Sequence, residues 1–293
     1  MPTYAIVEAP SHLGLRAAGV EELPGALLAA GLAERLEARS AARLPPPAWD
    51  PRIDPTTGLL NPAGLADFSP LLADSVGAVL DGGEFPIVLG GDCSILLGIT
   101  LALRRRGRYG LLFLDGHADF YQPEAEPAGE AASMELALVT GRGPDIVTNL
   151  EGRRPLLRDE DAVVFGFRDA EHAAAEGSRP LAPTLRAMDL ASVRRRGVEQ
   201  AARDALAHLE RGDGPAGFWI HLDVDVLDDA IMPAVDYRLP DGLGWDELTA
   251  VLRAAVASDR AVGLDVTIFN PTLDPDGRIA SALVGSLVSG LSR

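Results

Sequence analysis

The 293-residue sequence contains no lysine, so all 26 of its positively charged residues are arginines. This absence excludes a Schiff-base lysine and a P-loop lysine, and with them most pyridoxal enzymes and NTPases. A single cysteine, Cys93, excludes a disulfide within the chain. Basic residues are also outnumbered by acidic ones. The 43 Asp and Glu residues and the 26 Arg residues give a formal net charge of −17. Such a surface repels phosphate backbones and anionic lipids, so we expect no nucleic-acid partner and no membrane partner.

Targeting signals and long apolar runs are lacking as well. The first ten residues, MPTYAIVEAP, have neither the basic start nor the apolar core of a signal peptide. No uninterrupted apolar run reaches the length needed to span a membrane. We therefore expect a cytoplasmic protein. The hydrophobic content of 47% is ordinary for a globular protein with a large core.

Strand-like and helix-like stretches alternate along the chain. Strands are predicted at 4–8, 85–89, 109–114, 162–166, near 186–188, from 218, and at 261–266. Helices are predicted at 24–38, 65–80, 95–105, 130–140, 198–211, 245–258 and 277–291. Such alternation indicates a parallel sheet covered by helices on both faces. No repeat or linker interrupts the pattern, so we expect one domain over residues 1–293.

The stretch 111–121, LLFLDGHADFY, places potential metal ligands directly after an apolar run. Asp115, His117 and Asp119 follow at every second position. The apolar run is typical of a strand that is buried on both faces of a parallel sheet. Its ligands would therefore lie at the carboxyl edge of the sheet, where open α/β folds bind their ligands.

A second stretch, 218–229, repeats this design as FWIHLDVDVLDD. Because side chains alternate along a strand, His221, Asp223 and Asp225 share one face. Two strand ends rich in carboxylates would be costly to bury without cations between them. Carboxylates and one imidazole suit Mn²⁺, and a pair of such ions lowers the pKa of a water that they hold. The sequence thus predicts a metal centre that activates water.

Three motifs carry a family resemblance. GGDCS (90–94), DGHAD (115–119) and HLDVDVLD (221–228), in this order, resemble GGDHS, DAHxD and SxDxDxxDP of the arginase/agmatinase (ureohydrolase) family. The resemblance also takes in GFRD (166–169) and GLDVTIFNP (263–271). It implies a three-layer α/β/α fold with a central, mostly parallel sheet. It further implies two Mn²⁺ ions per chain, bridged by hydroxide, a small-molecule substrate, and assembly as a homo-oligomer.

The resemblance also implies a set of ligands and a reaction. The first ion would be held by Cys93, Asp115, Asp119 and Asp223. The second would be held by His117, Asp115, Asp223 and Asp225. The hydroxide would add to the carbon of an amidine, amide or ureido group, and the products would be an amine with a urea or an acid.

Departures from the family motifs bear on the substrate. Cys93 stands where the family has a metal-binding His, and no match to the family's HG pair is found around 132–133. Ile268 replaces a Glu that pairs the guanidinium, and Tyr121 replaces an Asn that holds the substrate carboxylate in arginases. Asp169 is retained where arginases contact the substrate amino group. An apolar Ile268 would leave a guanidinium without a counter-charge, so we expect a neutral C–N electrophile rather than arginine.

Several roles remain open. The candidate catalytic residues are Asp119, His221 and His172. His221 is either a core histidine with its hydrogen bonds satisfied or a residue that orients a ligand, and His172 is either solvated or a proton shuttle. Two other functions remain: a thiol hydrolase with Cys93 as nucleophile at a helix N-terminus, and a non-catalytic relative with a binding role and at most one metal.

Overall fold

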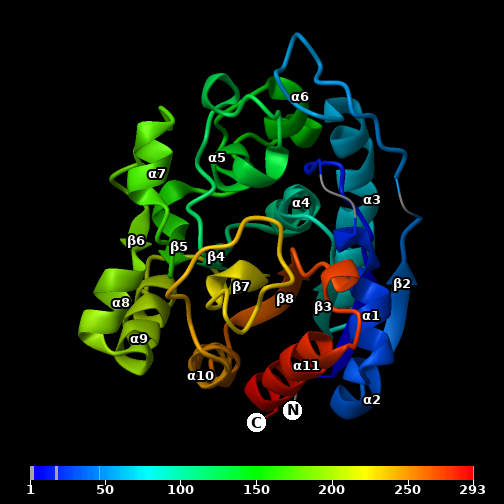
Figure 1. The fold of residues 1–293 in the computed structure, drawn as a ribbon, viewed down its shortest axis with the longest axis vertical. Helices are drawn as coiled ribbons and strands as arrows, with labels where there is room; N and C mark the ends of the chain where they lie inside the picture. Colours follow the sequence, from blue (N-terminus) through cyan, green and yellow to red (C-terminus); the bar gives the residue numbers. More distant parts are fainter. Residues whose placement is uncertain (1–2, 17–18, 46, 293) are drawn as a thin grey trace.

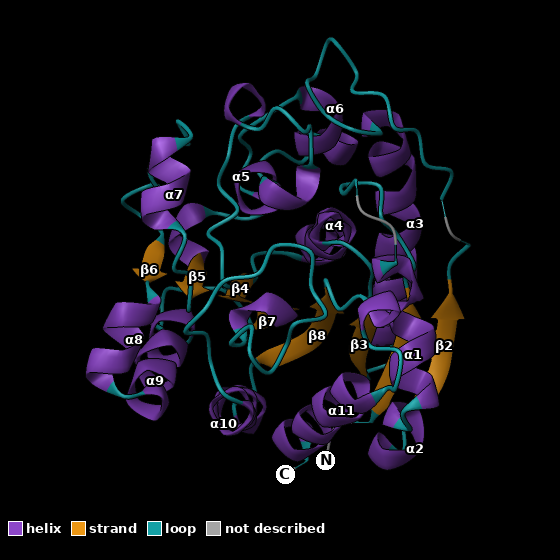
Figure 2. Ribbon diagram, viewed as in Figure 1, coloured by secondary structure: helices purple, strands orange, loops and turns teal. Residues whose placement is uncertain are grey.

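The computed structural model describes residues 3–16, 19–45 and 47–292, and an eight-stranded sheet crosses its centre (Figures 1 and 2). The strand order is β2-β1-β3-β8-β7-β4-β5-β6, and each neighbouring pair is parallel. The strands are β1 (Tyr4–Glu8), β2 (Arg39–Arg43), β3 (Phe85–Leu89), β4 (Gly110–Leu114), β5 (Ala162–Phe165), β6 (Arg186–Met188), β7 (Phe218–Asp223) and β8 (Ala261–Thr267).

Helices form a layer on each face of the sheet, and Figure 2 shows them above and below the strands. The lower layer consists of α1 (Leu23–Ala29), α2 (Leu32–Leu36), α8 (Leu190–Arg196), α9 (Val198–Leu209), α10 (Trp245–Ala257) and α11 (Arg278–Leu291). The upper layer consists of α3 (Pro62–Asp81), α4 (Leu96–Arg106), α5 (Glu135–Val139), α6 (Asp145–Thr148) and α7 (Ala170–Ala175). The predicted three-layer α/β/α fold with a parallel sheet is therefore confirmed.

Each strand divides its side chains between two cores. On β4, Leu112 and Leu114 pack against the lower layer, whereas Leu111 and Phe113 pack against the upper one. This division follows from the alternation of side chains along a strand. It explains why β4 is a continuous apolar run, since both of its faces are buried.

The structure differs from the sequence prediction at a few elements. The helix predicted at 24–38 is broken at Gly31, which has φ of 88°, and continues as α2. The edge strand β2 was not predicted, because its sequence RSAAR is short, partly exposed and has no apolar alternation. Helix α8 was also missed. The helix predicted at 130–140 begins instead as a 3-10 turn (Ala131–Ser133) before α5.

Helix α3 is long and apolar enough, by length and composition, to cross a membrane. Its buried residues include Leu65, Phe68 and Leu72, which pack in the upper core, while Asp67 and Asp74 are exposed. A helix that covers a sheet needs such an apolar face. Packing within the upper layer therefore accounts for the hydropathy of α3.

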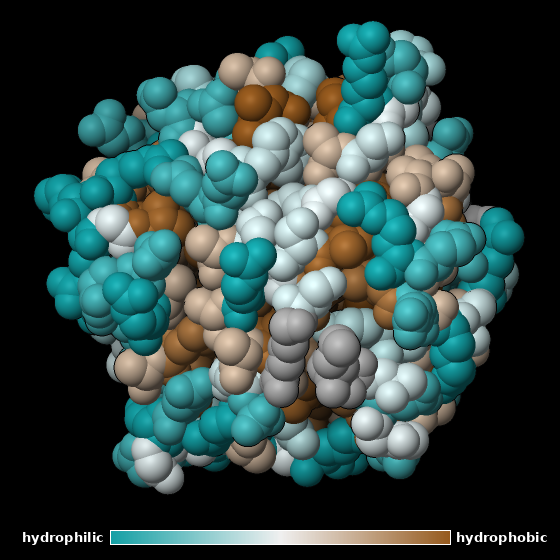
Figure 3. Space-filling view, turned by 90° about the horizontal axis from the view of Figure 1, so that it is seen from below, coloured by the Kyte–Doolittle hydropathy of each residue, from teal (hydrophilic) through white to brown (hydrophobic). Residues whose placement is uncertain are grey.

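The two ends of the described chain meet beneath the sheet. The Tyr4 hydroxyl of β1 donates a hydrogen bond of 2.6 Å to the carbonyl oxygen of Leu291, which ends α11. Figure 3 views the molecule from this side and shows hydrophobic residues in small patches separated by hydrophilic ones. Scattered apolar residues of this kind are ordinary on a folded protein.

Candidate metal centre

The ends of β4 and β7 bring the two acidic motifs together. These strands are parallel neighbours, and Leu114 pairs with Leu222. Asp115, the next residue after β4, therefore lies beside Asp223, the last residue of β7. Asp225 follows in a 3-10 turn (Val224–Val226), where its backbone N–H donates to Asp223 Oδ1 at 2.8 Å. The register of the sheet thus gathers the carboxylates at its carboxyl edge, as the motifs predict.

Two glycines allow the backbone to approach closely at this edge. A Cβ atom on Gly91 would lie 1.8 Å from the carbonyl oxygen of Ser11, and one on Gly116 would lie 2.7 Å from that of Asp225. No other residue type lacks the Cβ atom. These glycines therefore let the turns after β3 and β4 carry Cys93 and His117 toward the acids.

Five carboxylates are buried in one cluster, which we call the acid cluster. It contains Asp115, Asp119, Glu135, Asp223 and Asp225, none of them more than 7% exposed. Burial, followed by the charges of neighbouring carboxylates, raises the pKa of Asp115, Asp119 and Asp223 well above the usual range. Burial likewise raises the pKa of Glu135. Without cations, the cluster can be neutralised only by binding protons.

His117 is paired with the acid at one end of the cluster. Its Nδ1 atom lies 2.8 Å from Asp225 Oδ2 and 3.8 Å from Asp115 Oδ1. Burial would lower the pKa of His117, but the charge of Asp225 raises it overall. In return, burial would raise the pKa of Asp225, but the imidazole lowers it overall. Donor atoms of Asp115, His117 and Asp225 all lie within 4.8 Å of one another.

Cys93 lies at the other end of the cluster and is fully buried. Its thiol donates to Asp223 Oδ2 at 2.9 Å and contacts Thr267 Oγ1 at 3.0 Å. Burial, and then the charge of Asp223, raises the pKa of this thiol well above its usual range. Despite its position at the start of a helical turn, the thiol is thus not activated by its surroundings in the protein alone.

His221 points its free ring nitrogen toward the same end. Its Nδ1 donates to Asp265 Oδ2 at 2.7 Å, and Asp265 Oδ1 accepts a 2.6 Å hydrogen bond from Trp219 Nε1. The ring stacks on Phe113, with centroids 4.7 Å apart. Nε2 is buried and has no hydrogen-bond partner among residues 3–16, 19–45 and 47–292. Of the two interpretations of His221, a core histidine with satisfied hydrogen bonds does not fit this geometry.

A cavity of about 250 Å³ opens above the acid cluster. Its inner wall includes His117, Asp119, Asp223, Asp225 and Ile268, and its rim includes Tyr121, Glu126, His172, Glu176 and Tyr237. Ala132 and Ser133 also line it, at the place of the missing HG pair. The described residues that line the cavity include no arginine, so the cavity has no guanidinium with which to bind a carboxylate.

Two of the three predicted substrate-binding residues, Tyr121 and Ile268, line this cavity, whereas Asp169 does not. Tyr121 donates its hydroxyl to Glu176 Oε2 at 2.8 Å, and His172 Nε2 lies 3.3 Å from Glu176 Oε1 with its side chain 69% exposed. Ile268 has φ of 70°, which is an unusual conformation for a β-branched residue. Asp169 is buried outside the cavity wall, where Oδ1 accepts from the Ala118 N–H at 3.1 Å and Oδ2 has no partner in the part of the chain that the structure describes.

The sequence motifs did not reveal three residues of this region. Glu135 lies in the stretch SMELALV, which reads as an amphipathic helix, and Asp265 lies within a predicted strand. The sequence signal for both residues is an acid inside an apolar run, because isolated acids are seldom buried without a partner. Arg168 belongs to GFRD but shows no signal of its own.

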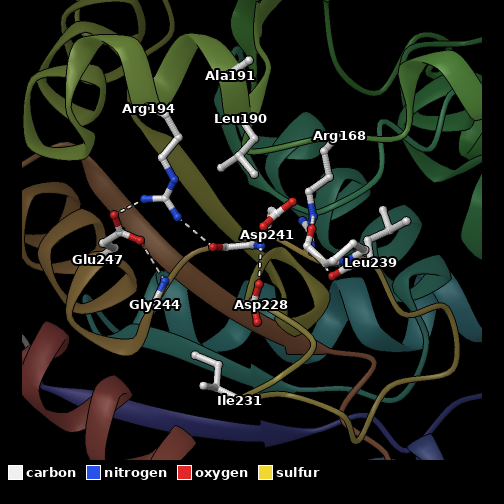
Figure 4. A pocket seen from close by; sticks show the side chains of 12 residues that line it. Arg168, Leu190, Ala191, Arg194, Asp228, Ile231, Leu239, Asp241, Gly244 and Glu247 are labelled. Carbon is white, nitrogen blue, oxygen red and sulfur yellow. Dashed lines mark hydrogen bonds and ion pairs between the residues drawn. The ribbon is translucent and has the colours of Figure 1, made fainter.

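Arg168 holds the loop that follows Asp225, and Figure 4 shows its side chain beside Leu239 in a neighbouring pocket. Its Nη2 donates to the carbonyl oxygens of Asp225, Leu227 and Leu239 at 2.9, 3.1 and 2.9 Å, and its Nε to that of Pro240 at 2.8 Å. A groove of about 840 Å³ lies here, lined partly by Arg168 and Arg194. No residue of the acid cluster lines this groove. Because Arg168 binds backbone carbonyl oxygens of the loop that carries Asp225, we assign it a positioning role.

The residues of the acid cluster fit divalent metal ions. Within the described part of the chain, Asp115 Oδ2 and His221 Nε2 are buried without hydrogen-bond partners, and the buried Oε atoms of Glu135 have at most the carboxyl group of Asp119. Donor atoms of Cys93, Asp115, Glu135 and His221 lie within 4.8 Å of one another, forming a group beside that of Asp115, His117 and Asp225. Buried polar atoms without partners are rare in native proteins, and bound ions are one established explanation.

Comparisons with known proteins agree with the fold and the motifs. The family model "Arginase family" matches residues 3–291. An arginase of Staphylococcus aureus (strain COL) is 27% identical, covering 95% of this chain and 93% of its own. An arginase of Bacillus caldovelox is 29% identical, covering 98% of each chain. The native structure of the B. caldovelox arginase superimposes with a TM-score of 0.88 at 26% identity, over 100% of this chain and 99% of that one. The chain therefore belongs to the arginase family, whose members are hydrolases that act on carbon–nitrogen bonds.

Proposed function

We propose that this chain is a hydrolase that uses a pair of divalent metal ions to cleave a non-peptide C–N bond in a linear amidine, ureido or amide compound other than arginine. Mn²⁺ is the first candidate for the ions, because most of the donors are carboxylate oxygens. The observation that carries the proposal is the acid cluster, whose five buried carboxylates lie beneath a cavity open to small molecules.

The residues of the chain divide the work of such a reaction. When bound, the ions would supply a water of lowered pKa and stabilise charge on the attacked carbon. Asp223, Asp225 and His117 line the cavity and would hold the reacting ion there. His172 is exposed at the rim beside Glu176 and would deliver a proton to the leaving amine.

The cavity wall favours particular substrates. Ile268 provides an apolar surface next to the reacting carbon, so a guanidinium there would lack a counter-charge. Glu126 and Glu176 at the rim, without a lining arginine, favour a substrate whose far end is an amine rather than a carboxylate. Among the three candidate groups, the ureido and amide groups are neutral at pH 7 and suit this wall better than an amidinium, so we propose a neutral scissile group connected by a short chain to a cationic or neutral end.

Hydrolysis of a substrate panel tests the proposal. Amidines, ureas and amides with amine or carboxylate ends would be assayed by release of ammonia, urea or amine, with Mn²⁺ and after chelation. We expect turnover only with metal and preferentially with amine ends. Asp223→Asn should lower kcat/KM by at least about 100-fold, because it removes a ligand. Asp213→Asn, whose side chain is 94% exposed, is the control and should act as the wild type. Lack of any turnover across the panel would favour the non-catalytic alternative.

A second candidate function has one observation in its favour. Cys93 lies near His221, with their donor atoms within 4.8 Å, and His221 in turn contacts Asp265. This arrangement places a nucleophile, a base and an orienting acid side by side. However, the Cys93 thiol donates to Asp223 and its pKa is raised, which opposes nucleophilic activation. Cys93→Ser separates the two functions: a thiol hydrolase would lose its activity while keeping both metals, whereas the metal hydrolase would lose metal.

A further inference from the structure

Three residues that depart from the family motifs or lie outside them converge on one point. Cys93 follows β3, His221 lies on β7, and Glu135 begins α5. Together with Asp115 they place four donor atoms within 4.8 Å of one another, and all four side chains are fully buried. Elements far apart in sequence thus build a compact group that contains a thiol, an imidazole and two carboxylates.

The group contains polar atoms that the protein itself leaves unsatisfied. His221 Nε2 and Asp115 Oδ2 have no hydrogen-bond partner among the described residues, and the buried Oε atoms of Glu135 have at most the carboxyl group of Asp119 as a partner. An unpaired buried carboxylate is costly, so each of these acids needs either a bound proton or a metal ion. Four donors around one centre satisfy the coordination of a single metal ion.

His221 is held in the orientation that a metal ligand requires. Its Nδ1 donates to Asp265, which is itself fixed by Trp219, and its ring stacks on Phe113. Metal-ligating histidines nearly always donate their other ring N–H to a carboxylate or a carbonyl, which fixes the tautomer and the ring plane. The Asp265–His221 pair therefore points Nε2 at the centre of the group.

We propose that Cys93, Asp115, Glu135 and His221 form a closed, four-coordinate site for Zn²⁺. This site would replace the ligand set implied by the family motifs for the ion at the Cys93 end, which contains Asp119 and Asp223. The inference deepens the proposed function, because Asp115 is shared with the group formed with His117 and Asp225. One thiolate and one imidazole favour Zn²⁺ over Mn²⁺, and four protein ligands without an open position are typical of a structural zinc.

The position of the site supports a division of labour. Asp119 and Asp223 line the cavity, whereas none of the four proposed zinc ligands is among the residues described as lining it. The zinc would therefore neutralise the carboxylates on the side of the acid cluster that faces away from the cavity and hold them in place. The ion that acts on the substrate would lie nearer His117 and Asp225, which line the cavity.

X-ray absorption of the wild-type protein tests the donor set without any mutation. The chain would be stripped with a chelator and reloaded with one equivalent of Zn²⁺. We expect one sulfur at about 2.3 Å and nitrogen or oxygen donors at about 2.0–2.2 Å around the zinc. A first shell without sulfur would overturn the proposal, whatever the protein hydrolyses.

Variants then identify the remaining ligands through Co²⁺ binding, which gives a thiolate-to-metal absorption band. Glu135→Gln and His221→Gln should each weaken Co²⁺ binding at the site that gives this band by about 100-fold or more. Asp265→Asn should weaken it by about 10–100-fold, because the His221 ring would no longer be held in its orientation. Asp225→Asn is the matched control from the other group and should leave the band unchanged. The zinc site is refuted if Glu135→Gln and His221→Gln bind Co²⁺ as the wild type does, while Asp119→Asn abolishes the band.

The two proposals fail in different ways. A sulfur-containing zinc shell in a protein that hydrolyses no member of the substrate panel would support this inference and reject the proposed function. Hydrolysis supported by two Mn²⁺ ions, with no zinc–sulfur contact, would support the function and reject the zinc site.

Discussion

At the scale of single residues, the molecule is distinguished by what stands at a few positions around the acid cluster. Cys93 and Ile268 replace a histidine and a glutamate of the family motifs, and Glu135 and His221 add donors that those motifs do not contain. Cys93 takes the place of a neutral ligand, and Ile268 removes a counter-charge for the substrate. Glu135 supplies an anion and His221 supplies an imidazole. These exchanges predict a change of metal and of substrate within a retained fold.

Cys93→His should shift the metal preference of the chain. A neutral imidazole is harder than a thiolate, so the variant should retain more Mn²⁺ relative to Zn²⁺ than the wild type does. The measurement is metal content after dialysis against equal concentrations of the two ions. The unfolding temperature of the metal-free variant reports whether the buried site accommodates the larger ring. An unchanged metal ratio in a folded variant would show that Cys93 is not a ligand.

Arginine and agmatine should not be substrates of the wild-type protein. Ile268 leaves the guanidinium unpaired, so urea release should be negligible even with metals bound. Ile268→Glu should raise urea release from agmatine above that of the wild type, because it restores a counter-charge beside the cavity. Urea production from arginine by the wild type at rates typical of enzymes, on the order of 1–10³ s⁻¹, would contradict the prediction.

At the scale of elements, the two edges of the sheet have different tasks. The carboxyl edge holds the acid cluster with unpaired atoms, whereas the opposite edge holds a satisfied ionic network. Asp161, which precedes β5 and is fully buried, accepts from Arg108 Nε and Nη2 at 2.6 and 2.8 Å and from Arg211 Nη2 at 2.6 Å. This network ties β4, β5 and the end of α9 together, away from the chemistry.

Asp161→Ala should destabilise the fold without affecting metal binding. The substitution removes the buried carboxylate that two partly buried guanidinium groups share, so we expect a loss of about 3 kcal/mol in the free energy of unfolding. Asp74→Ala removes the more exposed partner of Arg105, a side chain that is 70% exposed, and should cost less than about 1 kcal/mol. Denaturant unfolding measures both, and metal content should equal that of the wild type. Equal losses in the two variants would contradict the assigned role.

At the scale of the whole molecule, folding and metal binding are linked through the acid cluster. Folding raises the pKa of Asp115, Asp119, Asp223 and Glu135. In the metal-free protein, the folded state binds protons at these acids more tightly than the unfolded state does. The resulting contribution to the free energy of unfolding is fully present below the ordinary pKa near 4 and is lost as the pH rises through the raised pKa values. Metal ions bind the deprotonated acids, so their affinity rises over the same range.

The unfolding temperature should therefore respond to metal more strongly at higher pH. Calorimetry at about pH 5 and about pH 7.5, with and without saturating metal, gives the stabilisation at each pH. We expect the difference between loaded and metal-free protein to grow by several degrees toward pH 7.5. Subtracting the metal-free curve removes the contribution of the general negative charge. A difference that stays constant or shrinks as the pH rises would show that the acid cluster does not hold the ions.

Much of this architecture was already determined by the sequence alone. Alternating apolar runs predicted the parallel sheet, since a strand with helices on both sides must be apolar on both faces. Ligands at every second position after 114 and 220 predicted that Asp115 and Asp223 would meet, because the carboxyl ends of parallel strands share one edge. These predictions depend on local periodicity and on a rule of topology, and both can be read from residue order.

Only the tertiary structure decided which other residues join the acids. Glu135 reads as part of an amphipathic helix, and Asp265 reads as an acid within a strand, because a linear pattern does not state which distant atoms share a buried space. The register of β7 with β8 places Asp265 next to His221, and the packing of α5 over the sheet places Glu135 beside Cys93. Burial then turns four ordinary side chains into a site, since atoms withdrawn from water must find a partner elsewhere.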